Sequence, residues 1–349
     1  MMIKKLLLKL ALLSIPLVIL FGIYVLTDPF SLYFREGWPM RKVKLVTSYD
    51  YASTERYLAQ YEQYNYNSFV LGNSRCYVFL PEEWSKWLDS DAVVYKWGEP
   101  GESIYNMRKK LELIVDKGQT PENVLMLIDF HIIDNPRNTH PVYQSPPYIH
   151  HPKTSSTTWL GMQETFFRYY ITDFMFVRQW DYALNGEYKP YMNGYFPKTA
   201  LVTDFTPSTD SDLLIHNQAS MVLAESLLTG DSINYIHKHV TDTTDCSLCP
   251  PMDSTFSEQD IEDLLAIAAV FHSKGTNYKI IIGPTSDQKK MNPVNVAVLR
   301  HIFGAENVFD YSGHNEYSDN PGNFYDNDHF RISIASAILK DIYSGENKQ

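Results

Sequence analysis

The stretch Asn67–Arg75, which reads NSFVLGNSR, decides how the rest of the chain is interpreted. Its apolar run Ser68–Leu71 is typical of a buried strand, and the run stops on a glycine, an amide and a hydroxyl. Two interpretations of Ser74 are open. It lies in a tight turn or caps a helix, or it is a nucleophile held at the edge of a sheet, where loops gather function.

Apolar runs of strand length alternate with segments of helical period along the chain. The predicted strands are 68–71, 92–95, 124–128, 279–282 and 307–309, and the predicted helices are 81–88, 103–115, 257–275, 294–303 and 333–343. Such alternation predicts a parallel sheet with helices on both faces. The predicted fold class is α/β, a three-layer α/β/α arrangement with a parallel, flavodoxin-like sheet, an N-terminal membrane helix and a large insertion.

The N-terminus has the pattern of a membrane-spanning helix. Lys4, Lys5 and Lys9 precede or border residues 10–26, which carry no charge and are just long enough to span a bilayer. A cleaved signal peptide would need a shorter apolar core and a small-x-small cleavage site, and we find no such site. We therefore predict an uncleaved signal anchor that contacts the bilayer through residues 10–26. The nearby positive charges predict that the main domain lies outside the cytoplasm.

The predicted organisation has three parts: the signal anchor at residues 1–27, a membrane-proximal connector at residues 28–66, and a main domain at residues 67–349. An insertion at about residues 133–254 interrupts the main domain. It is too long for a loop, so we expect it to pack over the end of the sheet where α/β proteins commonly bind ligands.

Composition and cysteine usage narrow the classes of function. Of 349 residues 44% are hydrophobic, and the net charge of −11 with no long basic run argues against nucleic acid as a partner. Cys246 and Cys249 are open to interpretation as a metal site, a redox pair or a disulfide. The Pro250-Pro251 that follows them, and the lack of a second ligand pair nearby, favour a disulfide outside the cytoplasm. Neither a metal nor a cofactor is predicted.

A second chemically suggestive motif lies near the C-terminus, where residues 324–331 read FYDNDHFR. Asp326 precedes His329 by three residues. In a tight turn this spacing brings the carboxylate to one imidazole nitrogen while the other nitrogen faces a nucleophile. Asp328 competes for the same role, but as the neighbour of His329 it is expected to point elsewhere. The alternative is a helix start with capping aspartates.

Together, the motifs Gly72–Ser74 and Asp326–His329 resemble the first and last blocks of the SGNH (GDSL-type) hydrolases and acyltransferases. The resemblance is closest to the membrane-anchored branch, similar to alginate O-acetyltransferase accessory proteins and to the DltD proteins of teichoic acid alanylation. It covers roughly residues 67–130 and 255–344. It implies a catalytic triad of Ser74, Asp326 and His329.

The middle blocks of that family match less well. The second block supplies a glycine amide to the oxyanion hole, for which Gly98 and Gly101 are candidates. The third block contributes an asparagine, whereas this chain has Asp129 after the third predicted strand, and an ionised aspartate cannot donate a hydrogen bond. Asn135 is a further candidate. The oxyanion hole is then expected to rely on the backbone amides of Ser74 and a glycine. Without the asparagine, three possibilities stay open: low activity, a substitute donor or a non-catalytic role.

Three more residues are candidates for lining the substrate site: Arg75, Thr285 and Ser286. For Arg75, pairing with a neighbouring acid is favoured over holding an anionic group of the substrate. The expected function is that of an extracytoplasmic, membrane-anchored serine esterase or O-acyltransferase that modifies cell-surface glycan through an acyl-serine intermediate. The resemblance alone implies transfer, and it also implies a membrane-bound O-acyltransferase partner. The alternative is a catalytically weak or inactive SGNH-like envelope protein that binds glycan or that partner.

Overall fold

The computed structural model describes residues 2–30, 32–33, 49–133, 159–172, 174–187, 189–192, 229–230, 232–241 and 250–345. The chain divides into two compact units. We call Met1–Ala52 with Thr139–Ala200 the N-terminal unit, and Ser53–Asn138 with Leu201–Gln349 the sheet unit. The two units therefore share the predicted insertion.

Five strands of the described sheet unit form a parallel sheet in the order β2-β1-β3-β4-β5, which is the flavodoxin-like order. They are β1 (Ser68–Gly72), β2 (Val94–Gly98), β3 (Asn123–Leu127), β4 (Asn277–Ile282) and β5 (Val308–Asp310). The predicted α/β fold with a parallel sheet is confirmed, although β2 begins two residues later than predicted. Because the strands are parallel, their carboxyl ends meet at one edge, and the order of the strands reverses between β1 and β3.

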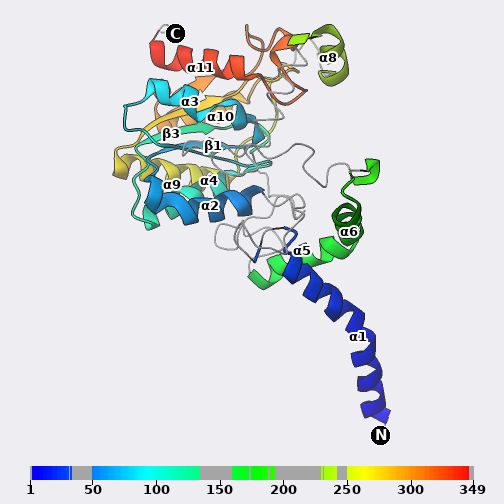
Figure 1. Ribbon diagram of the computed structural model, residues 1–349. Helices are drawn as coiled ribbons and strands as arrows, with labels where there is room; N and C mark the ends of the chain where they lie inside the picture. Colours follow the sequence, from blue (N-terminus) through cyan, green and yellow to red (C-terminus); the bar gives the residue numbers. More distant parts are fainter. Residues whose placement is uncertain are drawn as a thin grey trace. The chain divides into compact units, whose positions relative to one another are not determined.

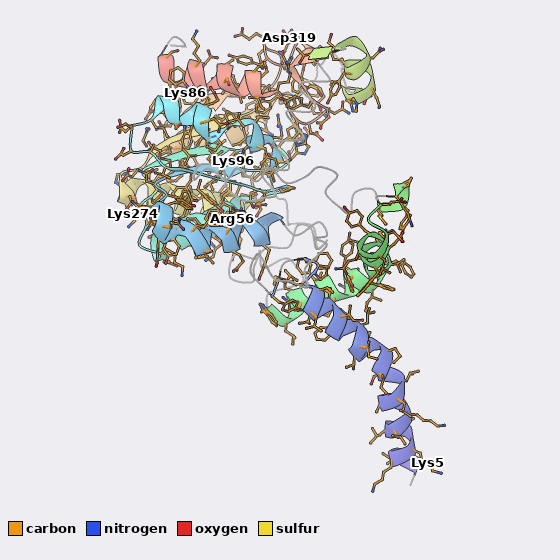
Figure 2. The ribbon with its side chains drawn as sticks, in the orientation of Figure 1. Lys5, Arg56, Lys86, Lys96, Lys274 and Asp319 are labelled. Carbon is orange, nitrogen blue, oxygen red and sulfur yellow. The ribbon has the colours of Figure 1, made fainter. Side chains whose placement is uncertain are left out.

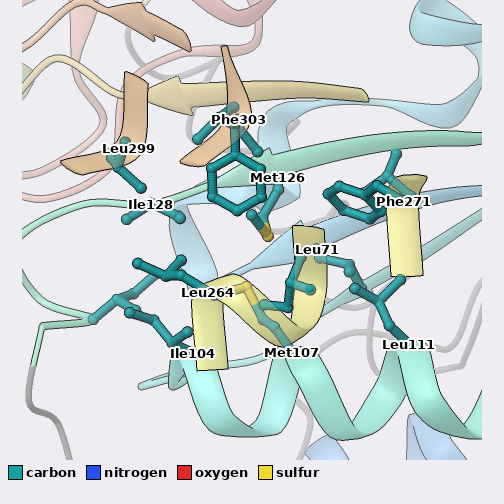
Figure 3. Packing of buried hydrophobic residues seen from close by; sticks show 14 of the residues in the cluster. Leu71, Ile104, Met107, Leu111, Met126, Ile128, Leu264, Phe271, Leu299 and Phe303 are labelled. Carbon is teal, nitrogen blue, oxygen red and sulfur yellow. The ribbon is translucent and has the colours of Figure 1, made fainter. Parts of the chain in front are cut away.

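Helices cover both faces of this sheet (Figure 1). One face is covered by α2 (Tyr49–Tyr64), α4 (Ile104–Asp116), α9 (Glu258–Lys274) and α10 (Pro293–Phe303), and the other by α3 (Pro81–Trp84) and α11 (Ile332–Ser344). Successive strand residues point to opposite faces, so Leu71 packs in the first core and Val70 in the second. Figure 3 shows the first core, where Leu71 and Met126 meet side chains of three helices.

The ends of the helices follow local sequence signals. A capping box begins α9: the Asp260 N–H donates to Ser257 Oγ, and the Ser257 N–H donates to the Asp260 carboxylate. The helix ends at Gly275, whose φ is 66°, a left-handed conformation that glycine adopts without strain. The predicted helix 81–88 is different, because α3 has a single turn and continues as the 3-10 helix η2 (Ser85–Trp87). Further short helices are η1 (Ser74–Val78), α8 (Ser232–His239), η6 (Ala305–Asn307) and η7 (Pro321–Asn323).

Two lysines are buried in the sheet unit. Lys96 of β2, labelled in Figure 2, donates from Nζ to the Tyr77 carbonyl at 3.1 Å. Lys110 of α4 donates to Glu102 at 2.6 Å and lies 3.8 Å from Glu99. A buried charge is tolerated only with such partners. Lys110 therefore fixes the turn that follows β2, which contains one of the two candidate glycines.

The N-terminal unit consists of α1 (Met2–Thr27), α5 (Trp159–Thr172), α6 (Met175–Asn185) and the 3-10 helix η5 (Pro190–Met192). Within the described ranges, α1 is the one helix long and apolar enough to cross a membrane, a property that a signal sequence shares. Most of α1 is exposed, but its C-terminal turns pack with α5 and α6 in a third core that contains Tyr24, Phe166 and Met175.

Candidate active site

The end of β1 positions Ser74. Gly72 has a φ of 149°, and a Cβ atom there would lie 2.9 Å from the Leu127 Cβ of β3, so only glycine fits where the chain leaves the sheet. Asn73 then caps η1, because its Oδ1 accepts the Arg75 N–H at 3.0 Å. Ser74 is consequently the first residue of η1, half-buried at the carboxyl edge of the sheet.

A short closed loop presents Asp326 and His329. The loop begins and ends at the buried Phe324 and Phe330, which pair as an antiparallel β-bridge. Asp326 Oδ1 accepts the His329 N–H at 2.8 Å and the Asp328 N–H at 2.9 Å. The backbone of the loop itself therefore fixes the carboxylate beside the imidazole ring.

The structure brings the three residues of the predicted triad together. Ser74 Oγ lies 2.9 Å from His329 Nε2, and His329 Nδ1 lies 2.9 and 3.0 Å from the two carboxylate oxygens of Asp326. An ionised carboxylate only accepts hydrogen bonds, so Nδ1 carries the proton and Nε2 is left to accept the Ser74 hydroxyl. This is the geometry that a nucleophile, a base and a group that orients the base require.

The charge of Asp326 is maintained by its surroundings. Burial by itself would raise the pKa of the Asp326 carboxyl. Hydrogen bonds from the His329 ring and from the backbone of Asp328 and His329 outweigh it and hold this pKa below its usual range. The ionised carboxylate is suited to stabilise an imidazolium ion beside it.

Asp328 points away from the His329 ring, as predicted, and contacts a second histidine. Its Oδ1 lies 3.6 Å from Nε2 of His131, and the interaction with that ring is the main cause of the lowered pKa of Asp328. His131 follows β3, so it reaches the same edge of the sheet. No motif in the sequence marks His131, although its place shortly after a predicted strand is a usable signal.

A buried ion pair lies directly after the strand ends. Arg75 NH1 donates to Asp129 Oδ2 at 2.9 Å, and both side chains are at most 2% exposed. The same carboxylate accepts the Asn73 side-chain amide at 2.9 and 3.1 Å and the His131 N–H at 2.9 Å. Of the two roles open to Arg75, the structure gives it the pairing with an acid. Asp129 correspondingly serves as the counterion of this arginine.

Arg75 also connects β1 to β4 and to the loop of His329. It donates from NH2 to the Pro284 carbonyl, and its guanidinium lies 5.5 Å from the centre of the Phe330 ring. Ser286, close behind Pro284, donates from Oγ to the Asn327 carbonyl at 2.7 Å. Thr285 and Ser286 are both buried. These contacts position the loop, and a role in lining a substrate site stays a prediction.

The two candidate oxyanion donors, Gly98 and Gly101, are glycines for different structural reasons. A Cβ atom at Gly98 would overlap the Cys76 sulfur, so packing alone requires glycine there. Gly101 has a φ of 65° in an exposed turn, where glycine is favoured for its backbone conformation. Their part in an oxyanion hole stays a prediction. Asn135 lies outside the described residues.

Among the described residues, neither Cys76 nor a cluster of possible metal ligands forms a second site. Cys76 is buried, and burial raises the pKa of its thiol, which makes it a poor nucleophile. Cys246 and Cys249 lie outside the described residues. In the part of the chain that is described, no three His, Cys, Asp or Glu side chains are grouped so that they could hold a metal ion. Neither a protein-family model nor a curated protein matches this chain.

Proposed function

We propose that this protein is a membrane-anchored serine esterase or O-acyltransferase of the SGNH type that acts on cell-surface glycan outside the cytoplasm. The observation that carries the proposal is the series of hydrogen bonds from Ser74 through the His329 ring to Asp326, at the carboxyl edge of a parallel sheet. The family assignment and the glycan substrate rest on the resemblance of the two motifs.

The mechanism that follows is a double displacement. His329 Nε2 takes the hydroxyl proton of Ser74 as Oγ attacks the carbonyl carbon of an ester. When the tetrahedral intermediate collapses, the bond to the leaving alcohol breaks and that alcohol receives the proton from His329. Water or a carbohydrate hydroxyl then loses its proton to His329 and attacks the acyl-serine. The bond between the acyl carbon and Ser74 Oγ breaks, Oγ takes the proton back from His329, and an acid or a new ester is released. Asp326 stabilises the imidazolium in both halves.

The oxyanion of each tetrahedral intermediate needs donors. Ser74 is the first residue of η1, so its N–H has no partner within that helix and is available for this purpose. The Asn73 amide is not, because it is bonded to Asp129. Removing one such donor commonly costs on the order of 100-fold or more in rate. We therefore expect a second donor from Gly98 or Gly101.

The packing of α1 supports a retained anchor over a cleaved signal sequence. Tyr24 is fully buried, and its ring lies 5.2 Å from the rings of Phe167 and Tyr170 on α5. Cleavage after α1 would remove this side chain from the core of the N-terminal unit. A segment that is discarded after export has no reason to complete the core of the mature protein.

The test is covalent labelling of the membrane-embedded chain with a fluorophosphonate probe, followed by identification of the modified residue. We expect labelling of Ser74 and its loss in Ser74→Ala, while Ser257→Ala, which alters a helix cap in the same unit, keeps it. Asp326→Asn is expected to slow labelling by about 10³-fold or more, because the imidazole loses its orienting group. Transfer is distinguished from hydrolysis by mass analysis of an oligosaccharide acceptor incubated with an activated acetyl ester.

One observation favours the non-catalytic alternative, a module that binds glycan or a membrane acyltransferase partner. Asp129 occupies the place of the family's asparagine donor, and its oxygens are all engaged by Asn73, Arg75 and His131. If Ser74 stays unlabelled under conditions that label a known serine esterase, the catalytic proposal fails and this alternative is favoured.

A further inference from the structure

One side of α6 is an apolar surface that the N-terminal unit leaves exposed. Phe174 precedes the first turn of α6 in the left-handed conformation, and Val177, Trp180 and Leu184 follow inside the helix. The spacing of three and four residues places these last three on one side of the helix. The exposed fractions of all four side chains, in chain order, are 63%, 45%, 39% and 77%. We call these four side chains the α6 face. Contiguous exposed apolar surface of this kind marks an interaction site.

The rotation of α6 about its axis is fixed by its opposite side. Met175 and Gln179 are buried against α5, and Gln179 Oε1 accepts the hydroxyl of Tyr170 at 2.6 Å. The α6 face is therefore turned outward by the core itself. Asp181, which follows Trp180 in the helix, is paired with Lys189 at 2.7 Å, which lowers the cost of bringing the helix against an apolar phase.

The position of α6 relative to α1 indicates what covers this face. The rings of Phe21 and Phe167 lie 4.9 Å apart, so the last turns of α1 pack directly on α5. The apolar part of α1 spans Ile3–Thr27, and about 20 residues cross the hydrocarbon of a bilayer. The last turns of a spanning α1 therefore lie at the membrane surface, and α5, which packs on these turns and also contacts α6, brings α6 close to that level. Trp, Phe and Leu are the side chains that interfacial helices insert there.

We propose that α6 is an interfacial helix whose α6 face lies in the lipid surface beside the C-terminal end of α1. This inference rests on the proposed retention of α1 as an anchor. A single spanning helix leaves a domain free to rotate about the helix axis and to tilt, whereas a second contact beside it restricts both motions. The N-terminal unit would then hold a defined orientation at the membrane.

The test uses the full chain reconstituted in phosphatidylcholine vesicles whose acyl chains are brominated close to the headgroups, with quenching of tryptophan fluorescence as the measurement. We expect Trp180→Phe to remove a large part of the quenched signal. Trp87→Phe is the matched control, because Trp87 is equally exposed, at 38%, but lies in the sheet unit. Leu184→Ser, which keeps Trp180, is expected to reduce its quenching, with near-ultraviolet circular dichroism checking that the core is intact.

Two results would overturn the proposal, and they differ in what they say about the anchor. If the chain stays in the membrane after alkaline extraction but Trp180→Phe leaves lipid quenching unchanged, another protein surface covers the α6 face and this inference alone fails. If the chain is found cleaved behind α1 and released, the anchor and the interfacial helix fail together. Labelling of Ser74 is measured independently of both.

Discussion

Asp129→Asn is the substitution whose effect the structure predicts most sharply. The Asp129 carboxylate is 1% exposed, balances the charge of Arg75, and accepts hydrogen bonds from Asn73 and His131. An asparagine has the same shape but no charge. Its NH2 group would face other hydrogen-bond donors, which need an acceptor at this position. Breaking one side of a buried ion pair costs about 3–5 kcal/mol, because the remaining charge is uncompensated.

That loss is a large share of a total stability of about 5–15 kcal/mol. For a unit of this size it corresponds to a fall in Tm of about 6–20 °C. The assay is urea unfolding of the full chain in detergent, followed by the fluorescence of the buried Trp84 and Trp97 of the sheet unit. The matched control is Asp328→Asn, since Asp328 is 62% exposed and an exposed pair is worth at most about 1 kcal/mol.

A double variant separates the buried charge from general disruption. Arg75→Met with Asp129→Asn removes both charges, so it is expected to be more stable than Asp129→Asn alone. The reasoning is refuted if the free energy of unfolding of Asp129→Asn lies within about 1 kcal/mol of the wild-type value, because breaking a buried ion pair costs more than that. It is also refuted if the effects of the two single substitutions simply add, which would mean that the two charges do not interact.

Gly98→Ala should destabilise the sheet unit by about 1–3 kcal/mol through overpacking against the Cys76 sulfur. Adding Cys76→Ala should restore part of that stability, and no restoration would mean that the sulfur is not the obstacle. In a chain lacking the other two cysteines, Cys76 should alkylate at least about 100-fold more slowly when native than in urea, as expected for a buried, protonated thiol. Because the folded pKa of Asp326 is depressed, its pairing stabilises the native state above the ordinary value of 3.8 and is lost as the pH falls through the folded pKa. The gap in unfolding free energy between the wild type and Asp326→Asn should therefore close only below that value, and a gap that widens there would contradict the assignment. His131→Gln should reduce the rate of Ser74 labelling less than tenfold. A loss comparable to that expected for Asp326→Asn, about 10³-fold, would instead assign His131 a direct part in the chemistry.

The sheet was predictable because its strands are apolar runs of the right length, and the exception is informative. The second predicted strand stops at Tyr95, but β2 continues through Lys96 to Gly98. A lysine interrupts an apolar pattern, so pattern analysis ends the strand there. What makes Lys96 tolerable is the carbonyl of Tyr77, 19 residues earlier, and local periodicity cannot report such a partner. The break between α5 and α6 is also invisible to local patterns. It lies at Phe174, which has a positive φ, and no glycine in the sequence marks it.

The candidate site was predictable to the extent that chain order carries it. Ser74 follows the first strand and the Asp326–His329 loop precedes the last helix, so parallel topology brings both to one edge of the sheet. The partner of Arg75 was open at the level of sequence, because Asp129 was interpreted through the oxyanion hole instead. An ion pair between residues 54 positions apart is a property of the folded sheet, and the sequence offers only the two residue types.

The last residue of β1 and the three that follow it, Gly72 to Arg75, meet different physical requirements, and those requirements are linked. Gly72 lets the chain leave the sheet close to Leu127, and Asn73 caps the short helix that begins there. The Asn73 amide is in turn bonded to the carboxylate that neutralises Arg75. Ser74 has the one side chain of the four that faces His329. A serine that merely completed a turn would not need a buried arginine, its counterion and a capping amide to hold it in place, and this is the physical reason to favour the nucleophile over the turn.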